Sequence, residues 1–308
     1  MAIRVLKPGL FTTIQDLGRP GYAHLGISPC GAADPLSLRI ANRLAGNAED
    51  TAALEMTLLG GTFEFEVDAV IALTGSLCDA QLGGLQAPAN TAWKVTAGSV
   101  LQFGSMQTGA RCYLAVQGGF DLPVIMGSAS TDVRGGFGGL HGRRLQAGDL
   151  LPTRESGAGN TRVLRQGALE RLAGEGPIRV TRGAQQDWFG PEAFETLNSR
   201  AYTISDLWDR AGLRLKGEAL HSLEPSQLLT DGIPLAAIQV PRDGQPIILF
   251  VDQQTTGGYP KIASVIAADI HRVGQLRPRQ EVRFREVTIS QAVQALREQE
   301  GLLQEIFE

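Results

Sequence analysis

Short apolar segments alternate with glycine-rich turns through most of the chain, which restricts it to a fold built mainly of β-strands with a few helices. One clear helix interrupts the first strands: Asp34 is a good N-cap, Pro35 takes the first helical position, and Gly46 supplies a stop. Strands at this spacing, with so few helices between them, predict closed β-barrels. The segments expected to be strands in the first half are residues 3–6, 55–67, 69–74, 91–95, 100–103 and 111–116.

The second half of the chain continues this pattern. Residues 237–240 and 247–251 are two apolar strands around Asp243–Gly244, a dipeptide that tolerates the positive φ of a hairpin turn. Thr288 and Gln291 have the spacing of a capping box at the start of a final helix. A chain of 308 residues is large for one domain, so we expect two. The expected domains are residues 1–173 and 174–308, with the exit from the first at residues 151–176.

Composition and charge argue against several classes of protein. A net charge of −4 and a pI near 5.7 argue against a nucleic-acid partner, for which a basic stripe is expected. No apolar run approaches the roughly 18 residues of a membrane span, and MAIRVLKPG lacks the apolar segment of a secretory signal. Three widely spaced cysteines, Cys30, Cys78 and Cys112, are typical of reduced thiols in the cytoplasm. The four histidines have no metal-ligand spacing, so no metal site is expected.

The densest group of polar residues follows the strand expected at residues 247–251. Asp252 ends that strand, and four amide and hydroxyl residues at 253–256 come directly after it. Gly257–Gly258 lets the backbone approach a ligand closely and is able to form an anion-binding nest, before Lys261 closes the loop. A polar site and a well-made turn whose backbone is capped by Asp252 both agree with these residues.

Loops in the first half also carry polar side chains. Arg19 has the forked guanidinium that binds carboxylates or phosphates, but it could equally form an internal ion pair with Asp16. Gln117 follows a strand as Asp252 does. Residues 128–142, which include Asp132, lack clear periodicity, and we expect them to form a mobile lid or a loop that contacts a partner.

Four motifs, taken together, resemble the 5-oxoprolinase C-subunit family, also called KipA or allophanate hydrolase subunit 2, of the biotin-dependent carboxyltransferase-like superfamily. The resemblance implies two cyclophilin-like β-barrel domains. The motifs are TTIQDLGRPGYAHLGISPCGAADPLSLRIANRLAGN at 12–47, RCYLAVQGGFDLPVIMGSASTD at 111–132, GGFGGLHGRRLQAGD at 135–149 and DQQTTGGYPK at 252–261.

The resemblance also implies a reaction, the hydrolysis of 5-oxo-L-proline to L-glutamate coupled to ATP hydrolysis. Asp252 would orient groups or act as a general base, and Lys261 and Arg19 would stabilise negative charge. Asp231 stands where relatives often show Glu or His, so its role is left open. The residues expected to bind substrate are Asp16, Gln117, Gly118, Asp132, Arg210, Gln239, Gln254, Thr255, Thr256, Gly257, Gly258 and Tyr259.

A protein of this family needs partners. The expected companions are 5-oxoprolinase subunits A and B, with a KipI-like subunit as the direct partner. ATP with Mg²⁺ serves the assembled complex and is bound at least partly by those partners, because this sequence has no recognised nucleotide motif. It has no Met-Lys pair, so no biotin is expected on this chain. The alternatives are a carboxyltransferase component of a biotin-dependent urea carboxylase system and a KipA-type protein that antagonises an inhibitor of a histidine kinase.

Overall fold

The computed structural model describes residues 2–155, 162–165, 167–224 and 228–307, and the chain forms two compact units. Unit 1 consists of Met1–Arg19, Cys30–Ala168 and Ile306–Glu308, and unit 2 of Pro20–Pro29 and Leu169–Glu305. The main division therefore lies after Ala168, where the sequence predicted a boundary near residue 173. Residues 156–161 of the expected exit segment lie outside the described part of the chain.

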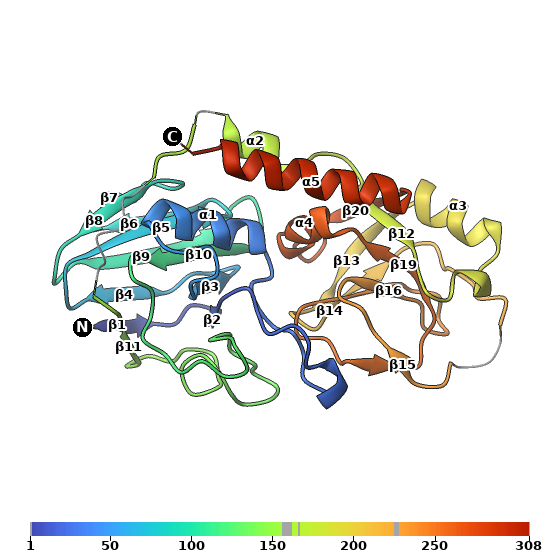
Figure 1. Cartoon of the computed structure of the whole chain (residues 1–308), viewed down its shortest axis with the longest axis horizontal. Helices are drawn as coiled ribbons and strands as arrows, with labels where there is room; N and C mark the ends of the chain where they lie inside the picture. Colours follow the sequence, from blue (N-terminus) through green and yellow to red (C-terminus); the bar gives the residue numbers. More distant parts are fainter. Residues whose placement is uncertain (1, 156–161, 166, 225–227, 308) are drawn as a thin grey trace. The chain divides into compact units, whose positions relative to one another are not determined.

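Unit 1 contains two antiparallel sheets that share one hydrophobic core (Figure 1). The six-stranded sheet has the order β11 (Leu150–Pro152), β1 (Ala2–Lys7), β4 (Thr62–Phe65), β9 (Val100–Met106), β6 (Cys78–Leu82) and β7 (Leu85–Gln86). The five-stranded sheet has the order β2 (Phe11–Gln15), β3 (Ala53–Thr57), β10 (Arg111–Val116), β5 (Ala69–Gly75) and β8 (Ala92–Val95).

The alternation of apolar and polar residues explains which faces of these sheets are buried. On β4, Phe63 and Phe65 are fully buried while Glu64 between them is partly exposed. Phe63 meets Phe103 of β9 edge to face at 5.9 Å, and burying each such side chain contributes about 1.5–3 kcal/mol. Residues of both sheets belong to the same core, which holds the two layers together.

The helix predicted near residue 35 is confirmed as α1, Pro35–Ala45. Asp34 Oδ1 accepts a hydrogen bond of 2.8 Å from the Ser37 N–H, and Gly46 ends the helix with φ of 83°. The helix packs on β5 and β10 of the five-stranded sheet through its apolar face. It therefore covers the outer side of that sheet.

Unit 2 is a closed seven-stranded barrel (Figure 1). Parallel pairing of Ile178 with Phe284 joins the first and last strands and closes the ring. Helices α2 (Ala168–Ala173), α3 (Pro191–Ser199), α4 (Ile270–Gly274) and α5 (Ile289–Glu305) accompany the strands. The barrel order is β12 (Ile178–Arg182), β19 (Lys261–Val265), β16 (Ala237–Gln239), β17 (Ile247–Leu249), β14 (Gly212–Lys216), β13 (Ala201–Trp208) and β20 (Glu281–Glu286).

The hairpin predicted around Asp243–Gly244 is confirmed. Strands β16 and β17 pair antiparallel, and Gly244, with φ of 73°, donates its N–H to the Pro241 carbonyl at 3.0 Å. The predicted capping box is also confirmed, because the Gln291 N–H donates to Thr288 Oγ1 at 3.2 Å at the start of α5. The turn at Asp243–Gly244 thus determines where the strand before Asp252 begins, and the capping box determines where the final helix begins.

A short two-stranded ladder, β15 (Asp231–Gly232) with β18 (Thr256–Gly257), lies in unit 2 outside the barrel. It occupies part of the segment that was expected to be a loop with an anion-binding nest. Gly257 is part of β18, and neither Gly257 nor Gly258 has a positive φ, so the left-handed backbone of the expected nest is not found at these two residues.

The predicted fold class, mainly β with a few helices, is confirmed: unit 2 closes into a β-barrel, and unit 1 consists of two sheets around one core. None of the described helices is both long and apolar enough to cross a lipid bilayer.

Candidate functional site

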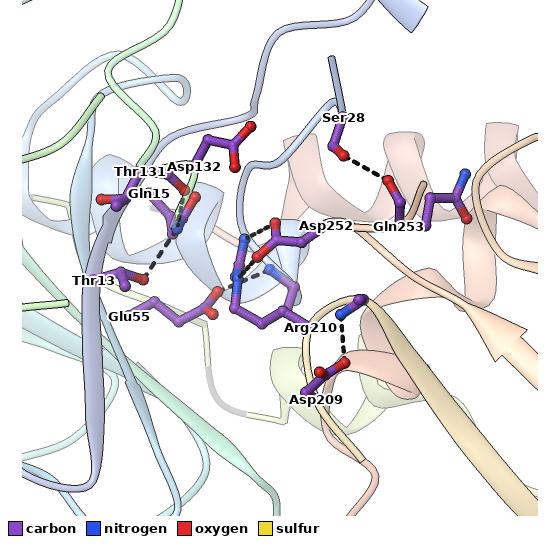
Figure 2. A network of polar contacts seen from close by, with 12 residues as sticks. Thr13, Gln15, Ser28, Glu55, Thr131, Asp132, Asp209, Arg210, Asp252 and Gln253 are labelled. Carbon is purple, nitrogen blue, oxygen red and sulfur yellow. Dashed lines mark hydrogen bonds and ion pairs between the residues drawn. The ribbon is translucent and has the colours of Figure 1, made fainter. Parts of the chain in front are cut away.

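Asp252 in unit 2 is held by Arg210 through a two-pronged ion pair (Figure 2). Arg210 Nε donates to Asp252 Oδ2 at 2.8 Å, and Nη2 donates to Oδ1 at 2.9 Å. The Asp252 N–H also donates to the Arg210 carbonyl at 2.9 Å, so backbone and side chains join the same two residues. Both side chains are buried. A bidentate pair of this kind fixes the orientation of the carboxylate as well as its charge.

Lys261, the first residue of β19, forms another ion pair in unit 2. Its Nζ lies 3.0 Å from Asp231 Oδ2, and its side chain is 1% exposed against 49% for the aspartate. The pKa of Asp231 is lowered, first by the hydrogen bond from Lys261 and then by the Gly232 N–H. Gln185 joins both residues, because its Nε2 donates to Asp231 and its Oε1 accepts the Lys261 N–H. Asp231, whose role was left open from the sequence, is thus the ion-pair partner of Lys261.

Two predicted amides come together at Gly257. A Cβ atom on Gly257 would lie 3.1 Å from Gln239 Nε2 and 3.7 Å from Gln254 Nε2, and 2.8 Å from Ile233. Gln239 is buried and donates to the Tyr259 carbonyl at 3.4 Å. Glycine at this position therefore leaves the space that brings the amides close to the backbone.

Gln253 is a polar residue that the sequence analysis did not single out. Its side-chain Nε2 donates to the Ile233 carbonyl at 3.0 Å, which fixes the side-chain amide. Its backbone carbonyl accepts a hydrogen bond from Ser28 Oγ (Figure 2). Its Oε1 is buried and has no hydrogen-bond partner among the described residues. A fixed, unsatisfied acceptor of this kind is able to bind the N–H of a small ligand. Its position directly after Asp252 was the only signal for it in the sequence.

The other predicted residues of this loop are more exposed. The backbone carbonyl of Thr255 accepts a hydrogen bond of 2.9 Å from the Ile233 N–H, which holds the loop to the segment around Ile233. Thr256 is exposed on β18, and the Tyr259 side chain is 37% exposed. Gly258 lines a separate cavity of about 240 Å³ together with Tyr259 and Arg242.

In unit 1, Asp16 binds the loop that contains residues 128–130. Its Oδ1 accepts from Ser128 Oγ at 2.6 Å and from Ser130 Oγ at 2.5 Å, and its Oδ2 accepts from the Ala129 N–H at 2.6 Å. The Gly18 N–H adds a fourth bond at 2.8 Å. All four donors are neutral, so the internal ion pair with Arg19 that was considered from the sequence is absent.

Arg19 is almost fully buried, at 1% exposure, and has no carboxylate partner among the described residues. Its Nη2 donates to the Ser130 carbonyl, its Nε donates to the Ile125 carbonyl at 3.5 Å, and its guanidinium stacks 4.9 Å from the Phe137 ring centre. Nη1 has no hydrogen-bond partner in the described part of the chain. A buried cation with an unused donor is an expensive arrangement unless an anion meets it.

Residues 128–142 were expected to form a mobile lid or a loop that contacts a partner, and the first part of this segment is anchored to unit 1. Ser128, Ser130, Thr131 and Asp132 are buried, and the hydrogen bonds of Asp16 hold this segment to the fold. Asp132 Oδ1 accepts the Gly135 N–H at 2.7 Å, so it caps a turn within the same segment.

Gln117 and Gly118 form a separate group in unit 1. Gln117 Nε2 donates to the Ala45 carbonyl at 3.0 Å, and the Gly118 N–H donates to Asn47 Oδ1 at 2.8 Å. Gly118 has φ of 81°, and a Cβ there would lie 2.6 Å from the Glu155 carbonyl oxygen. These contacts tie the end of β10 to the end of α1.

Sequence reasoning also missed a buried polar cluster in unit 1. Tyr113 Oη donates to Glu55 Oε2 at 2.6 Å and accepts the Asp34 N–H at 2.8 Å. Burial, followed by the negative charge of Glu55, raises the pKa of Tyr113. Nearby on β2, Gln15 Nε2 donates to Thr13 and to the Thr131 carbonyl, while Oε1 has no partner among the described residues (Figure 2). Glu55 and Tyr113 lie inside strands, where the sequence pattern indicated only core, and Gln15 lies on β2, which was not among the predicted strands.

Comparison with known proteins identifies the class. Residues 25–286 match the model of the family described as carboxyltransferase domain, subdomain A and B, and the chain belongs to this family. It is 39% identical to the C subunit of 5-oxoprolinase from Escherichia coli (strain K12) over 306 residues, which is 99% of this chain and 97% of that relative. It is also 39% identical to the C subunit of 5-oxoprolinase from Haemophilus influenzae over 96% of this chain and 94% of that relative. The family predicted from the motifs is thereby confirmed.

A solved structure agrees with this assignment. The chain superposes on the Kluyveromyces lactis urea amidolyase with a TM-score of 0.91 and 30% identity over 99% of its length. It spans 20% of that longer chain.

Proposed function

We propose that this chain is the C subunit of a multi-subunit, ATP-dependent 5-oxoprolinase. The assembly would convert 5-oxo-L-proline, ATP and water into L-glutamate, ADP and phosphate. The observation that carries the proposal is the 39% identity to the Escherichia coli protein over 99% of this chain and 97% of that relative. Because the match extends over almost all of both chains, it compares whole proteins and not one shared domain.

The proposal gives this chain companions, namely subunits A and B, with a KipI-like subunit as the direct partner. The assembly would work in the cytoplasm, a compartment that agrees with the three free cysteines of the chain. Among the described residues, no group of three or more His, Cys, Asp or Glu side chains is placed to hold a metal ion. ATP with Mg²⁺ is assigned at least partly to the partners because this sequence has no recognised nucleotide motif, and the roles below concern only residues of this chain.

A lactam resists hydrolysis because its amide is stabilised by resonance, and negative charge develops on its carbonyl oxygen as the bond is attacked. Cations and amides placed near that oxygen stabilise the charge. The buried ammonium of Lys261 and the unused Nη1 of Arg19 have this chemistry, each within its own unit. Gln239 and Gln254, which meet at Gly257, are suited to positioning the substrate.

The ion pair with Arg210 favours an orienting role for Asp252 over a general base. Both of its carboxylate oxygens already accept a hydrogen bond from the guanidinium. Asp252 would then act as a positioning residue that holds Arg210 and the loop after β17.

Reconstitution tests the proposal. The chain is purified with subunits A and B, and phosphate release is measured with and without 5-oxoproline. We expect substrate-dependent release only when this chain is present, and we expect the exposed control variant Arg283→Gln to match the wild type. A complex that forms but shows no response to 5-oxoproline would overturn the proposal.

The superposition on urea amidolyase, with a TM-score of 0.91, favours one second candidate. In that reading the chain passes a carboxyl group from biotin, carried on another chain, to an amide nitrogen such as that of urea. An avidin blot of the purified assembly together with a urea-dependent assay separates the two. A biotinylated partner and urea-dependent turnover would favour carboxyl transfer.

A further inference from the structure

Unit 1 contains a cavity of about 410 Å³ whose lining residues have no role in the proposed function. Its wall includes the end of β5 at Gly75, the connection through Ser76, and the side chains of Cys78 and Cys112. No residue of the predicted site lines it. The cavity therefore needs its own explanation.

Two of the three cysteines meet in this cavity. The Cys78 and Cys112 Sγ atoms lie 3.7 Å apart in a thiol–thiol hydrogen bond. Cys112 is 1% exposed on β10, whereas Cys78, the first residue of β6, is only partly buried. The two residues belong to different sheets of unit 1, so their spacing along the chain carries no sign that they are neighbours.

The backbone around this pair leaves room for the sulfurs to approach. Cys112 pairs across the sheet with Gly75, which has no side chain. The register of β6 against β9 shifts between Cys78 and Ala80, so Cys78 stands at an irregular strand end. A disulfide requires the sulfurs to close from 3.7 Å to about 2.05 Å, which local rotation of the more exposed cysteine can supply.

The chain before this strand end is well anchored. Ser76 donates its N–H to the Arg111 carbonyl at 2.7 Å, and its Oγ accepts the Gly109 N–H at 2.9 Å. The Leu77 N–H donates to Thr108 Oγ1 at 3.1 Å. These bonds hold the chain in place directly before Cys78, so the thiol is presented to the cavity at a defined position.

The two thiols differ in acidity. The hydrogen bond with Cys112 lowers the pKa of Cys78, against the opposing effects of burial and of Asp79. The same hydrogen bond and full burial raise the pKa of Cys112. The thiol that reaches the cavity is thus the better nucleophile, and the inner one is its neutral hydrogen-bond partner.

We propose that Cys78 and Cys112 form a dithiol site that hydrogen peroxide oxidises to an intramolecular disulfide through this cavity. The Cys78 thiolate attacks one peroxide oxygen, forming an S–O bond and breaking the O–O bond, and the departing hydroxide takes up a proton to leave as water. Cys112 then loses its proton and attacks the Cys78 sulfur, forming the S–S bond and expelling a second water. Two thiols lose two electrons and two protons, and one peroxide becomes two waters.

The test uses the full chain treated with a small excess of hydrogen peroxide. Thiol titration of the unfolded product should fall from three free thiols to one, and peptide mapping should find Cys78 joined to Cys112. Cys30, buried at 4% exposure and outside the cavity, should stay reduced. Three free thiols after treatment, or a product that contains Cys30, would overturn the proposal.

Matched variants assign the order of the steps. Cys30→Ser should form the disulfide at the wild-type rate. Cys112→Ser should stop at a Cys78 sulfenic acid that dimedone traps, and Cys78→Ser should leave Cys112 unmodified. Circular dichroism checks that each variant is folded. Trapping of Cys112 instead of Cys78 would contradict the assigned order, and equal oxidation of all three cysteines would contradict the site itself.

Discussion

The predicted site residues of the two units balance their charges in different ways. In unit 2, Arg210 pairs with Asp252 and Lys261 with Asp231. In unit 1, Asp16 receives only neutral donors, and Arg19 contacts only carbonyl oxygens and an aromatic ring. Charges that are paired depend on each other for stability, whereas Arg19 keeps an unused N–H for an anion from outside. The comparison separates Arg19, which has a buried N–H without a partner among the described residues, from the predicted site residues of unit 2 whose charges are already paired.

Breaking the Arg210–Asp252 pair should give the largest loss of stability. In Asp252→Ala, the buried Arg210 guanidinium loses the carboxylate that accepts hydrogen bonds from its Nε and Nη2, and we expect the free energy of unfolding to fall by about 3–5 kcal/mol. Urea unfolding measures it. The double variant Arg210→Met/Asp252→Leu, which removes both charges, should lose less than Asp252→Ala alone. A double variant that loses as much as the sum of both single variants would show that the charges do not depend on each other.

Asp16→Asn should have the next largest effect. The amide nitrogen would face the Ala129 N–H, and the charge-assisted bonds from Ser128 and Ser130 would weaken. We expect a loss of about 1.5–3 kcal/mol in the free energy of unfolding. Asp121→Asn, at an aspartate whose side chain is 70% exposed, is the matched control and should change little. Equal losses in both variants would mean that Asp16 does not anchor the loop.

Arg19→Met should cost less stability than either change above. It removes a buried cation that has no carboxylate partner among the described residues, so no buried anion is left behind, and the loss should be about 1 kcal/mol from its carbonyl contacts. In the assembled enzyme the same variant should lower 5-oxoproline-dependent turnover by at least about tenfold, because one lost anion contact is worth about 1.4 kcal/mol or more. If Arg19→Met lost as much stability as Asp252→Ala and kept normal turnover, Arg19 would hold the fold and would not bind an anion.

The smallest effect concerns pH. Lys261 and the Gly232 N–H lower the pKa of Asp231 in the folded chain. The stability from this pair is therefore complete above the unfolded pKa, about 4, and is lost as the pH falls through the lower folded value. Melting temperatures between about pH 5 and pH 2 should fall less steeply for Asp231→Asn than for the wild type. Asp187→Asn, at an exposed aspartate without an ion-pair partner among the described residues, should keep the wild-type slope.

Local signals predicted local structure well. Asp34, Pro35 and Gly46 located α1, and Asp243–Gly244 located the hairpin that leads to Asp252. In each case the information lies within a few residues, because caps and turns depend on side chains that bond to their own backbone. Strand spacing and chain length predicted β-barrels and two domains, and the family motifs added the cyclophilin-like type of barrel.

Long-range pairings could not be predicted in the same way. Arg210 and Asp252 are 42 residues apart, and Asp16 and Ser128 are 112 apart. Which strands become neighbours decides these contacts, and strand order was not readable from periodicity. For this reason the role of Asp231 was left open, the anchoring of residues 128–132 by Asp16 was not predicted, and the Cys78–Cys112 pair went unnoticed.

The most direct test of the proposed function is the turnover of the reconstituted complex with Lys261→Met beside Arg283→Gln. Both variants remove a cation from the barrel of unit 2, but only Lys261 belongs to the predicted site. We predict that 5-oxoproline-dependent phosphate release falls at least about tenfold for Lys261→Met and stays at the wild-type level for Arg283→Gln. Wild-type rates for both variants in an intact complex would contradict a catalytic role for Lys261.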